Sequence, residues 1–210
     1  MKKLHAWKPA VGFVLSSAFL LLPVRQAAGA LIAYYTFDQD TGQTVVDETG
    51  DYHGTLGANA SPGPDDPTWT PDGKFGGALS FDGGDYVSIG APIIPASGPF
   101  TFAGWGKTNI SHNGAMIGQG GADPGRFIVY YNRATSGDVA RLYFDNSQAV
   151  GTTVTNDGQW HHVAVTRSPT NLFSLYVDSV LEATLSKSTN VRTSDNTFLG
   201  ANTSRSWRLI

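Results

Sequence analysis

Apolar and polar residues alternate one by one along several short segments of the chain. Between residues 99 and 107, Phe100 and Phe102 fall on one side, whereas Trp105 and Lys107 fall on the other. Side chains of a strand point alternately to the two faces of a sheet, so a period of two predicts half-buried strands. The same pattern predicts strands at residues 31–37, 78–81, 86–89, 127–131, 141–144 and 161–167.

Residues 173–177 and 180–185 form two further apolar runs that are separated only by Asp178 and Ser179. This spacing predicts a hairpin with a short turn. The runs are bounded by Gly, Asn, Asp or Pro, and no segment after residue 30 has the period of a long amphipathic helix. We therefore expect an all-β fold, either an antiparallel β-sandwich or a jelly roll.

The first thirty residues have the pattern of a secretory signal peptide. Lys2 and Lys3 precede an apolar stretch at residues 11–24, and Ala28-Gly29-Ala30 fits a small-residue cleavage site. The stretch is shorter than the ~20 residues that span a bilayer, and no later segment is longer. We expect residues 1–30 to be removed, and residues 31–210 to form one secreted or cell-surface domain without a membrane span.

Composition excludes several classes of function. The chain has 14 Lys and Arg against 17 Asp and Glu, and four of the cations but no acid lie in the first thirty residues. Residues 31–210 therefore carry a net charge of −7, which argues against nucleic-acid binding through a basic surface. The absence of Cys excludes disulfides, thiolate metal sites and a thiol nucleophile.

Several motifs resemble those of one family. They include Tyr34-Tyr35-Thr36-Phe37-Asp38, His53-Gly54-Thr55-Leu56, Phe81-Asp82-Gly83 and Trp160-His161-His162-Val163-Ala164. In this order they are similar to bacterial LamG-like jelly-roll domains of the concanavalin A-like lectin/glucanase superfamily. The resemblance covers residues 31–201 and implies a jelly roll, but this scaffold hosts lectins, enzymes and adhesion modules alike.

The end of the sequence departs from the family pattern. Such domains usually close with a strand of the form Gly-x-Ile-Asp-Asp-Val-Arg beside the first strand, but here residues 199–210 contain no such run. We expect the closing strand to be missing or incomplete. Either the chain is a fragment of a longer protein, which we favour, or a partner chain supplies the strand.

Catalysis is not expected. Glucanases of the superfamily place two Glu around an Asp on one strand, because retaining hydrolysis needs two carboxyl groups about 5 Å apart. This sequence contains only Glu48 and Glu182. A pair that includes Asp residues distant in sequence stays open, but a non-enzyme is the prediction.

Two sets of residues are candidates for metal binding. Neighbouring His161 and His162 point to opposite faces of a strand, so we expect packing rather than a shared ion. Acidic turns fit calcium better, because calcium prefers several oxygen ligands. The candidate calcium ligands are Asp38, Asp40, Asp82 and Asp85. The alternative is that these acids cap their own turns.

The candidate ligand-binding surface is the outer face of a sheet around Trp105. An exposed indole can stack on a sugar ring while Lys107 hydrogen-bonds to hydroxyl groups. Tyr131, or Tyr130, together with Arg133 extends the predicted patch. The alternative is that Trp105 only packs, covered by a loop or by the curvature of the sheet, and for this residue alone we favour packing over binding. The predicted function is a secreted, non-catalytic glycan-binding module. One alternative is a structural or adhesive cell-surface domain that binds protein. Another is a piece of a larger extracellular protein or of a glycoside-active enzyme.

Overall fold

The computed structural model describes residues 29–201, which form short strands and one 3₁₀ turn, η1 (Ala134–Ser136). The strands before residue 110 are β1 (Thr44–Val45), β2 (Gly54–Leu56), β3 (Thr68–Thr70), β4 (Ala78–Ser80), β5 (Val87–Ile89) and β6 (Phe100–Gly106). Those after it are β7 (Asn113–Gln119), β8 (Phe127–Arg133), β9 (Val139–Phe144), β10 (Ser147–Val154), β11 (His161–Arg167), β12 (Leu172–Val177), β13 (Val180–Ser186) and β14 (Thr197–Leu199).

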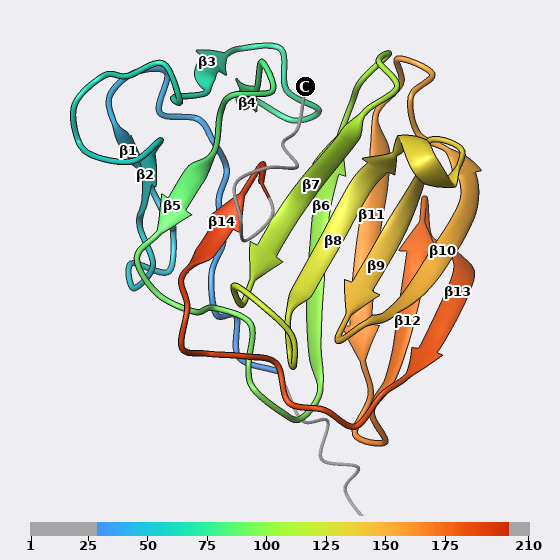
Figure 1. The fold of residues 1–210 in the computed structure, drawn as a ribbon. Coiled ribbons are helices and arrows are strands. Elements are labelled where there is room, and N and C mark those ends of the chain that lie inside the picture. The colour runs from blue at the N-terminus through green and yellow to red at the C-terminus, as the bar shows by residue number, and fades with distance from the viewer. Residues whose placement is uncertain (1–28, 202–210) are drawn as a thin grey trace, which may run out of the picture.

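Two antiparallel sheets pack face to face (Figure 1). The eight-stranded sheet has the order β1-β2-β5-β14-β7-β8-β9-β10, and the four-stranded sheet has the order β13-β12-β11-β6. A small hairpin of β3 and β4 lies beside them. The predicted all-β antiparallel sandwich is confirmed.

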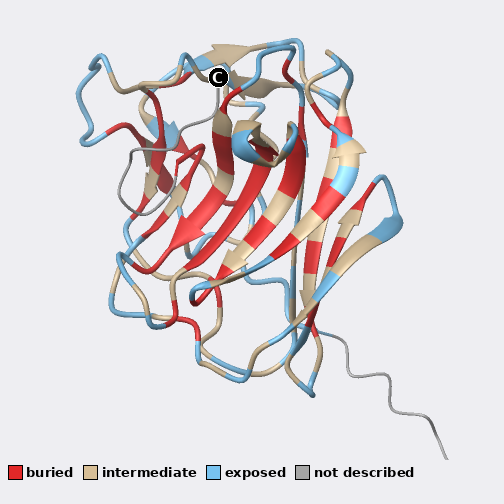
Figure 2. Cartoon of the chain, turned by 45° about the vertical axis from the view of Figure 1, so that its right-hand side comes forward, coloured by how far each residue is buried: buried red, intermediate tan, exposed pale blue. Residues whose placement is uncertain are grey.

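The core fills the space between the two sheets, because every second residue of the central strands points inward. Figure 2 shows buried residues gathered on the central strands and exposed residues mainly in the connecting loops. The core side chains of the larger sheet include Phe127, Val129, Leu142 and Phe144, and those of the smaller sheet include Val163, Val165, Phe173 and Leu175.

Strands with strict alternation lie where the sequence places them. β11 spans the predicted residues, and β6 differs from its prediction by one residue at each end. The predicted hairpin is β12 and β13, joined by Asp178 and Ser179 at φ 48° and 71°. Positive φ at both turn residues matches the twist of the flanking strands.

The predicted strand at residues 31–37 is wrong. This segment carries no strand assignment in the structure. Its backbone is held instead by a turn, because Tyr34 N–H donates to Asp47 Oδ1 at 2.7 Å and Tyr34 C=O accepts from Glu48 N–H at 2.8 Å. An extended segment becomes a strand only when a neighbour completes its ladder, and within residues 29–201 none does.

Two predictions concern residues outside the described region. The signal peptide lies almost wholly in residues 1–28, and the end of the sequence lies in residues 202–210. The domain boundaries and the incomplete closing strand therefore stay predictions. Among residues 29–201 there is no helix long and apolar enough to cross a membrane.

Candidate functional site

Trp105 lies on the outer face of the four-stranded sheet. Phe100 and Phe102 of the same strand pack against the core, and alternation therefore turns Trp105 away from it. The indole is 39% exposed. The predicted orientation of these three residues is confirmed.

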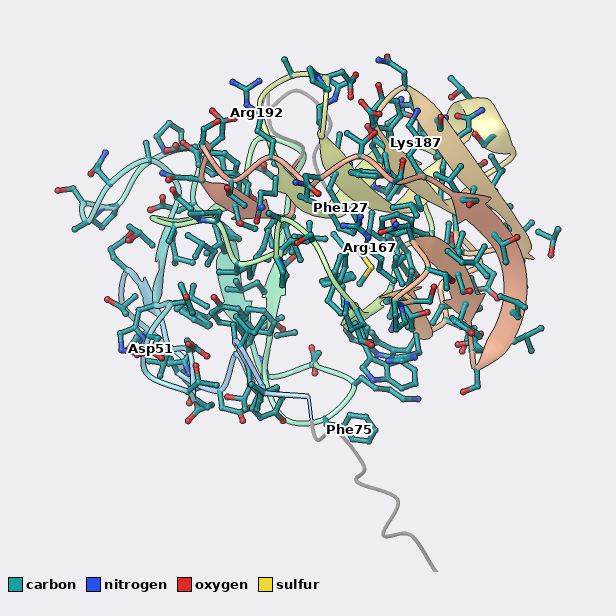
Figure 3. The ribbon with its side chains drawn as sticks, turned by 90° about the horizontal axis from the view of Figure 1, so that it is seen from below. Asp51, Phe75, Phe127, Arg167, Lys187 and Arg192 are labelled. Carbon is teal, nitrogen blue, oxygen red and sulfur yellow. The ribbon has the colours of Figure 1, made fainter. Side chains whose placement is uncertain are left out.

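Three side chains surround the indole of Trp105. The Phe75 ring meets it edge-on at 5.9 Å between centroids, and Lys74 Nζ lies 4.9 Å from its centroid. His162, the cross-strand partner of Trp105 in β11, places its ring at 5.1 Å. Phe75 is 72% exposed and projects from the surface in Figure 3. We call Lys74, Phe75, Trp105 and His162 the Trp105 patch.

A hollow of about 1620 Å³ runs beside the Trp105 patch. Its walls are residues 29–38 on one side and β6 on the other, and all four residues of the patch line it. Lys107 and Trp160 also line it, and both continue into a second hollow of about 370 Å³. The structure therefore brings the predicted residues Trp105 and Lys107 to one open surface.

Tyr131 does not belong to this surface. The prediction that it contacts a ligand is therefore wrong. It is fully buried between the sheets, and burial raises the pKa of its hydroxyl group above the ordinary value. Its ring lies so close to Gly106 that a Cβ at Gly106 would be 2.6 Å from Tyr131 Cδ2. Inward alternation on β8 places Tyr131 with Phe127 and Val129 in the core.

Arg133 also lies away from the Trp105 patch. It ends β8 in the other sheet, and its guanidinium group lies 5.0 Å from the centroid of Tyr130. Tyr130 faces away from the main core and packs with Ala115 and Ile128. The predicted extension of the patch by Tyr130 or Tyr131 with Arg133 is therefore wrong, because β8 is in a different sheet from β6.

Three of the four predicted calcium ligands accept hydrogen bonds from backbone N–H groups. Asp38 Oδ1 accepts from Gly77 N–H at 2.7 Å. Asp82 Oδ1 accepts from Gly84 N–H at 2.9 Å, and Asp82 N–H donates to Asp85 Oδ2 at 2.7 Å. Asp40 has a positive φ of 61° and directly precedes the bend at residues 41–43. In residues 29–201 no three His, Asp or Glu side chains are grouped to hold a metal ion, and calcium stays a prediction.

Asp47 has a structural role that its sequence position did not reveal. Its buried carboxylate accepts hydrogen bonds from the N–H groups of Tyr34, Thr49 and Tyr52 and from the Thr49 hydroxyl group. Burial acts to raise its pKa, but these hydrogen bonds outweigh burial and lower the pKa to about 2. Asp47 thus anchors residues 34–52 and has little capacity left for a cation.

The two histidines of the Trp-His-His motif point to different faces, as predicted. His161 is buried, and its Nδ1 and Nε2 lie 2.7 Å from Asp178 Oδ2 and 3.1 Å from Asp157 Oδ1. Burial acts to lower its pKa, but the bonds to Asp178 and Asp157 raise the pKa above the ordinary value. His162 contacts Trp105 instead. The arrangement is an ion-pair cluster on one face and an aromatic contact on the other.

Glu182 of β13 ties the two sheets together. Its carboxylate accepts hydrogen bonds from Thr152 N–H at 2.9 Å and from the N–H and hydroxyl groups of Thr153 in β10. Glu48 accepts a weaker bond from the Thr36 hydroxyl group at 3.4 Å. Both Glu side chains therefore form structural hydrogen bonds, Glu182 with backbone and hydroxyl groups and Glu48 with a hydroxyl group.

Sequence comparison points to one superfamily. Residues 81–208 match the family model described as the concanavalin A-like lectin/glucanases superfamily. No curated protein sequence matches the chain. The matched region includes β5 to β14, and so both sheets and Trp105.

Solved structures of other proteins have a similar fold. One is domain 4 of AbnA, a GH43 extracellular arabinanase from Geobacillus stearothermophilus, in complex with arabinotriose, with 20% identity, a TM-score of 0.62, and coverage of 81% of this chain and 83% of that one. Another is the binding domain of Paraclostridial Mosquitocidal Protein 1, with 9% identity, a TM-score of 0.59, and coverage of 80% and 43%. Domains LG4-5 of the mouse laminin alpha1 chain share 17% identity at a TM-score of 0.42, with coverage of 52% and 29%.

The chain thus spans less than half of two of these three structures. At these identities the likeness concerns the fold alone. It confirms the concanavalin A-like jelly roll that the sequence motifs imply.

Proposed function

Since the chain belongs to the concanavalin A-like lectin/glucanase superfamily, we propose that it is a carbohydrate-binding module without catalytic activity. The observation that carries the proposal is the Trp105 patch, which presents two exposed aromatic rings beside an open hollow. Aromatic rings stack on the apolar faces of sugars, and charged groups at their edges hydrogen-bond to the hydroxyl groups. Lys74 and Lys107 supply such groups.

The fold is compatible with this function. Domain 4 of the arabinanase has arabinotriose bound, which makes arabinotriose a reasonable first probe. The hollow beside the patch is long enough to follow β6, so a linear oligosaccharide is a better candidate than a single sugar. The two Glu side chains are engaged in structural hydrogen bonds, which supports a role in binding rather than hydrolysis.

The test is calorimetric titration of the full chain with arabinotriose and with a panel of neutral linear oligosaccharides. We expect Trp105→Ala to weaken binding by tenfold or more, equivalent to about 1.4 kcal/mol, because the stacking surface is lost. Val180→Ala, which truncates an exposed apolar residue at the start of β13, is the matched control. Equal affinity of wild type and Trp105→Ala for every sugar would contradict the proposal.

Secretion belongs to the same proposal. A module that binds polymeric glycans must reach them outside the cell, and the sequence of residues 1–30 provides a signal for export. Mass spectrometry of the exported protein is expected to find an N-terminus near Leu31. An N-terminus at Met1 in the exported protein would contradict the cleavage.

A second candidate function is protein binding through strand addition. Within residues 29–201, β6 has a neighbour on one side only, and its other side faces the hollow. Across the hollow, Leu31 and Tyr34 are 69% and 53% exposed. An edge strand with unpaired backbone groups is a template for a strand from a partner.

Hydrogen exchange tests this second candidate. Alternate amides of β6 are expected to exchange quickly in the isolated chain and slowly once a partner strand is bound. Slow exchange of every β6 amide in the isolated monomer would exclude strand addition at this edge.

A further inference from the structure

A cluster of Tyr and Arg side chains lies on the outer face of the eight-stranded sheet. Alternation on β8 turns Tyr130 away from the core, and its cross-strand partner on β9 is Arg141. Tyr143, two residues further along β9, packs on the same side. Together with Arg126 and Arg133 these residues form what we call the Tyr–Arg cluster.

The guanidinium groups of the cluster lie over the two rings. Arg133 and Arg141 are 5.0 and 5.5 Å from the centroid of Tyr130, and Arg126 is 4.7 Å from the centroid of Tyr143. Tyr130 is only 4% exposed although it points away from the core. The cations therefore form the accessible layer of this face, and the rings hold them in place from below.

Positive charge exceeds negative charge in the cluster. Asp123 contacts it, with 3.5 Å between Asp123 Oδ2 and Arg126 Nη2, and the same carboxylate accepts a hydrogen bond from the Tyr143 hydroxyl group. Burial, followed by the charge of Arg133, lowers the pKa of Arg141 below its ordinary value. Arg133 and Arg141 thus repel each other, and Arg141 is partly removed from water, so a bound anion would offset both effects at Arg141.

Donor groups of the cluster also lack partners. The Nε atoms of Arg126 and Arg141 are buried without a hydrogen-bond acceptor in the described part of the chain. Arg141 donates a long bond of 3.5 Å to Ser136 Oγ. Arg presents its N–H groups in a planar fork that matches the two oxygens of a carboxylate.

We propose that the Tyr–Arg cluster is a second ligand site that binds the carboxylate of an acidic sugar, such as a uronate unit in a polysaccharide. The sugar part of this inference rests on the proposed function, and the charge part rests on the cluster. Stacking on Tyr130 and Tyr143 limits the motion of the guanidinium groups, so little side-chain entropy is lost on binding. The net charge of −7 over residues 31–210 disfavours nucleic-acid phosphates as the anion.

The experiment is calorimetric titration of the full chain with tetragalacturonate, with its neutral methyl ester and with dextran sulfate. We expect tetragalacturonate to bind, the ester to bind at least tenfold more weakly, and Arg141→Gln to lose at least tenfold in affinity for tetragalacturonate. Arg126→Gln, which alters the other ring, is expected to lose affinity as well. If a thermal melt shows that the Arg141→Gln variant is unfolded, the Arg126→Gln variant still tests the proposal.

The matched control is Arg192→Gln. Arg192, labelled in Figure 3, lies next to Arg126, since its backbone N–H donates to Gly125 C=O, but its guanidinium group is paired with Asp195. Its replacement removes a nearby positive charge without altering the Tyr–Arg cluster, so the affinity is expected to stay unchanged. Equal binding of the acid and its ester, or unchanged affinity in both cluster variants, would overturn the proposal. Binding of dextran sulfate without tetragalacturonate would overturn the carboxylate assignment.

Trp105→Ala separates this inference from the proposed function. It is expected to weaken neutral oligosaccharides and to leave tetragalacturonate binding unchanged. Failure of all neutral sugars with retained tetragalacturonate binding would reject the Trp105 patch alone, whereas the opposite result would reject the Tyr–Arg cluster alone.

Discussion

At the scale of single residues, Asp47 holds together the first part of the described chain. Replacing it with Asn removes the negative charge and leaves backbone N–H groups poorly paired in a buried place. We expect Asp47→Asn to lower the free energy of unfolding by about 2–4 kcal/mol in urea titrations at pH 7.

Asp51→Asn is the control for this change, because Asp51 is exposed in the same segment (Figure 3). A pKa of about 2 in the folded state is below that of an unfolded Asp. The stabilisation is therefore fully present above about pH 4 and disappears as pH falls through about 2. A loss as small as that of Asp51→Asn would contradict the assigned role.

The His161 cluster gives the protein a different dependence on pH. Its raised pKa means that the stabilisation is full below the unfolded value of about 6.5 and is lost as pH rises through the folded value. The lowered pKa values of Asp178 and Asp157 set the other limit, since their contribution is lost in acid, below about pH 4.

We therefore expect His161→Asn to destabilise the protein more at pH 5.5 than at pH 8.5. Urea titrations of both proteins at both pH values measure the difference. An equal effect at the two pH values would show that the pKa of His161 is the same in the folded and unfolded protein, which would contradict the raised pKa.

The candidate site was only partly predictable from individual residues. Alternation in β6 was sufficient to place Trp105 on an outer face. Lys74 and Phe75 come from a loop about thirty residues earlier, and no local pattern announces that they contact Trp105. Tyr130 and Tyr131 are equivalent in sequence, and only the register of β8 separates the core residue from the surface residue.

At the scale of secondary structure elements, predictability followed regularity. β11 has uninterrupted alternation, and both β11 and the β12–β13 hairpin were predicted nearly residue by residue. β7 was missed because Gly114 and Gly118 interrupt its apolar pattern, although it lies in the middle of the larger sheet. β14 has three residues and is defined by its neighbours β5 and β7, which no local pattern reveals.

Strand β6 offers a paired test of packing. A Cβ at Gly106 would meet the rigid ring of Tyr131 at 2.6 Å, whereas a Cβ at Gly104 would meet the flexible end of Met116 at 2.9 Å. We expect Gly106→Ala to lower stability by about 1–3 kcal/mol and Gly104→Ala to lower it less. Thermal melts of the two variants measure this order, and the reverse order would contradict the packing described for Tyr131.

At the scale of the whole molecule, the predicted fold is correct because many short strands with one buried face leave few alternatives to a sandwich. Motif order added the superfamily, which matches over residues 81–208. The distribution of charge between the two outer faces was not predictable, because it depends on how β8 and β9 are aligned.

The calcium prediction also belongs to this scale, since any ion would stabilise the folded chain as a whole. Calcium binding to the native state requires the melting midpoint to be higher in calcium than in chelator, by about 2.7 kcal/mol of stability at a hundredfold excess over Kd. Asp82→Asn is then expected to reduce the difference. Identical midpoints in both buffers would reject calcium as a ligand.

The hydrogen bonds of Glu182 make one edge of the sandwich more resistant to force than the other. At one margin the carboxylate fastens β13 to β10, and at the other, within residues 29–201, β6 borders the hollow without a second neighbour. A force that separates the sheets therefore meets less resistance at β6 than at Glu182. When force is applied across the sandwich, we expect the two sheets to separate first at β6 and last at Glu182.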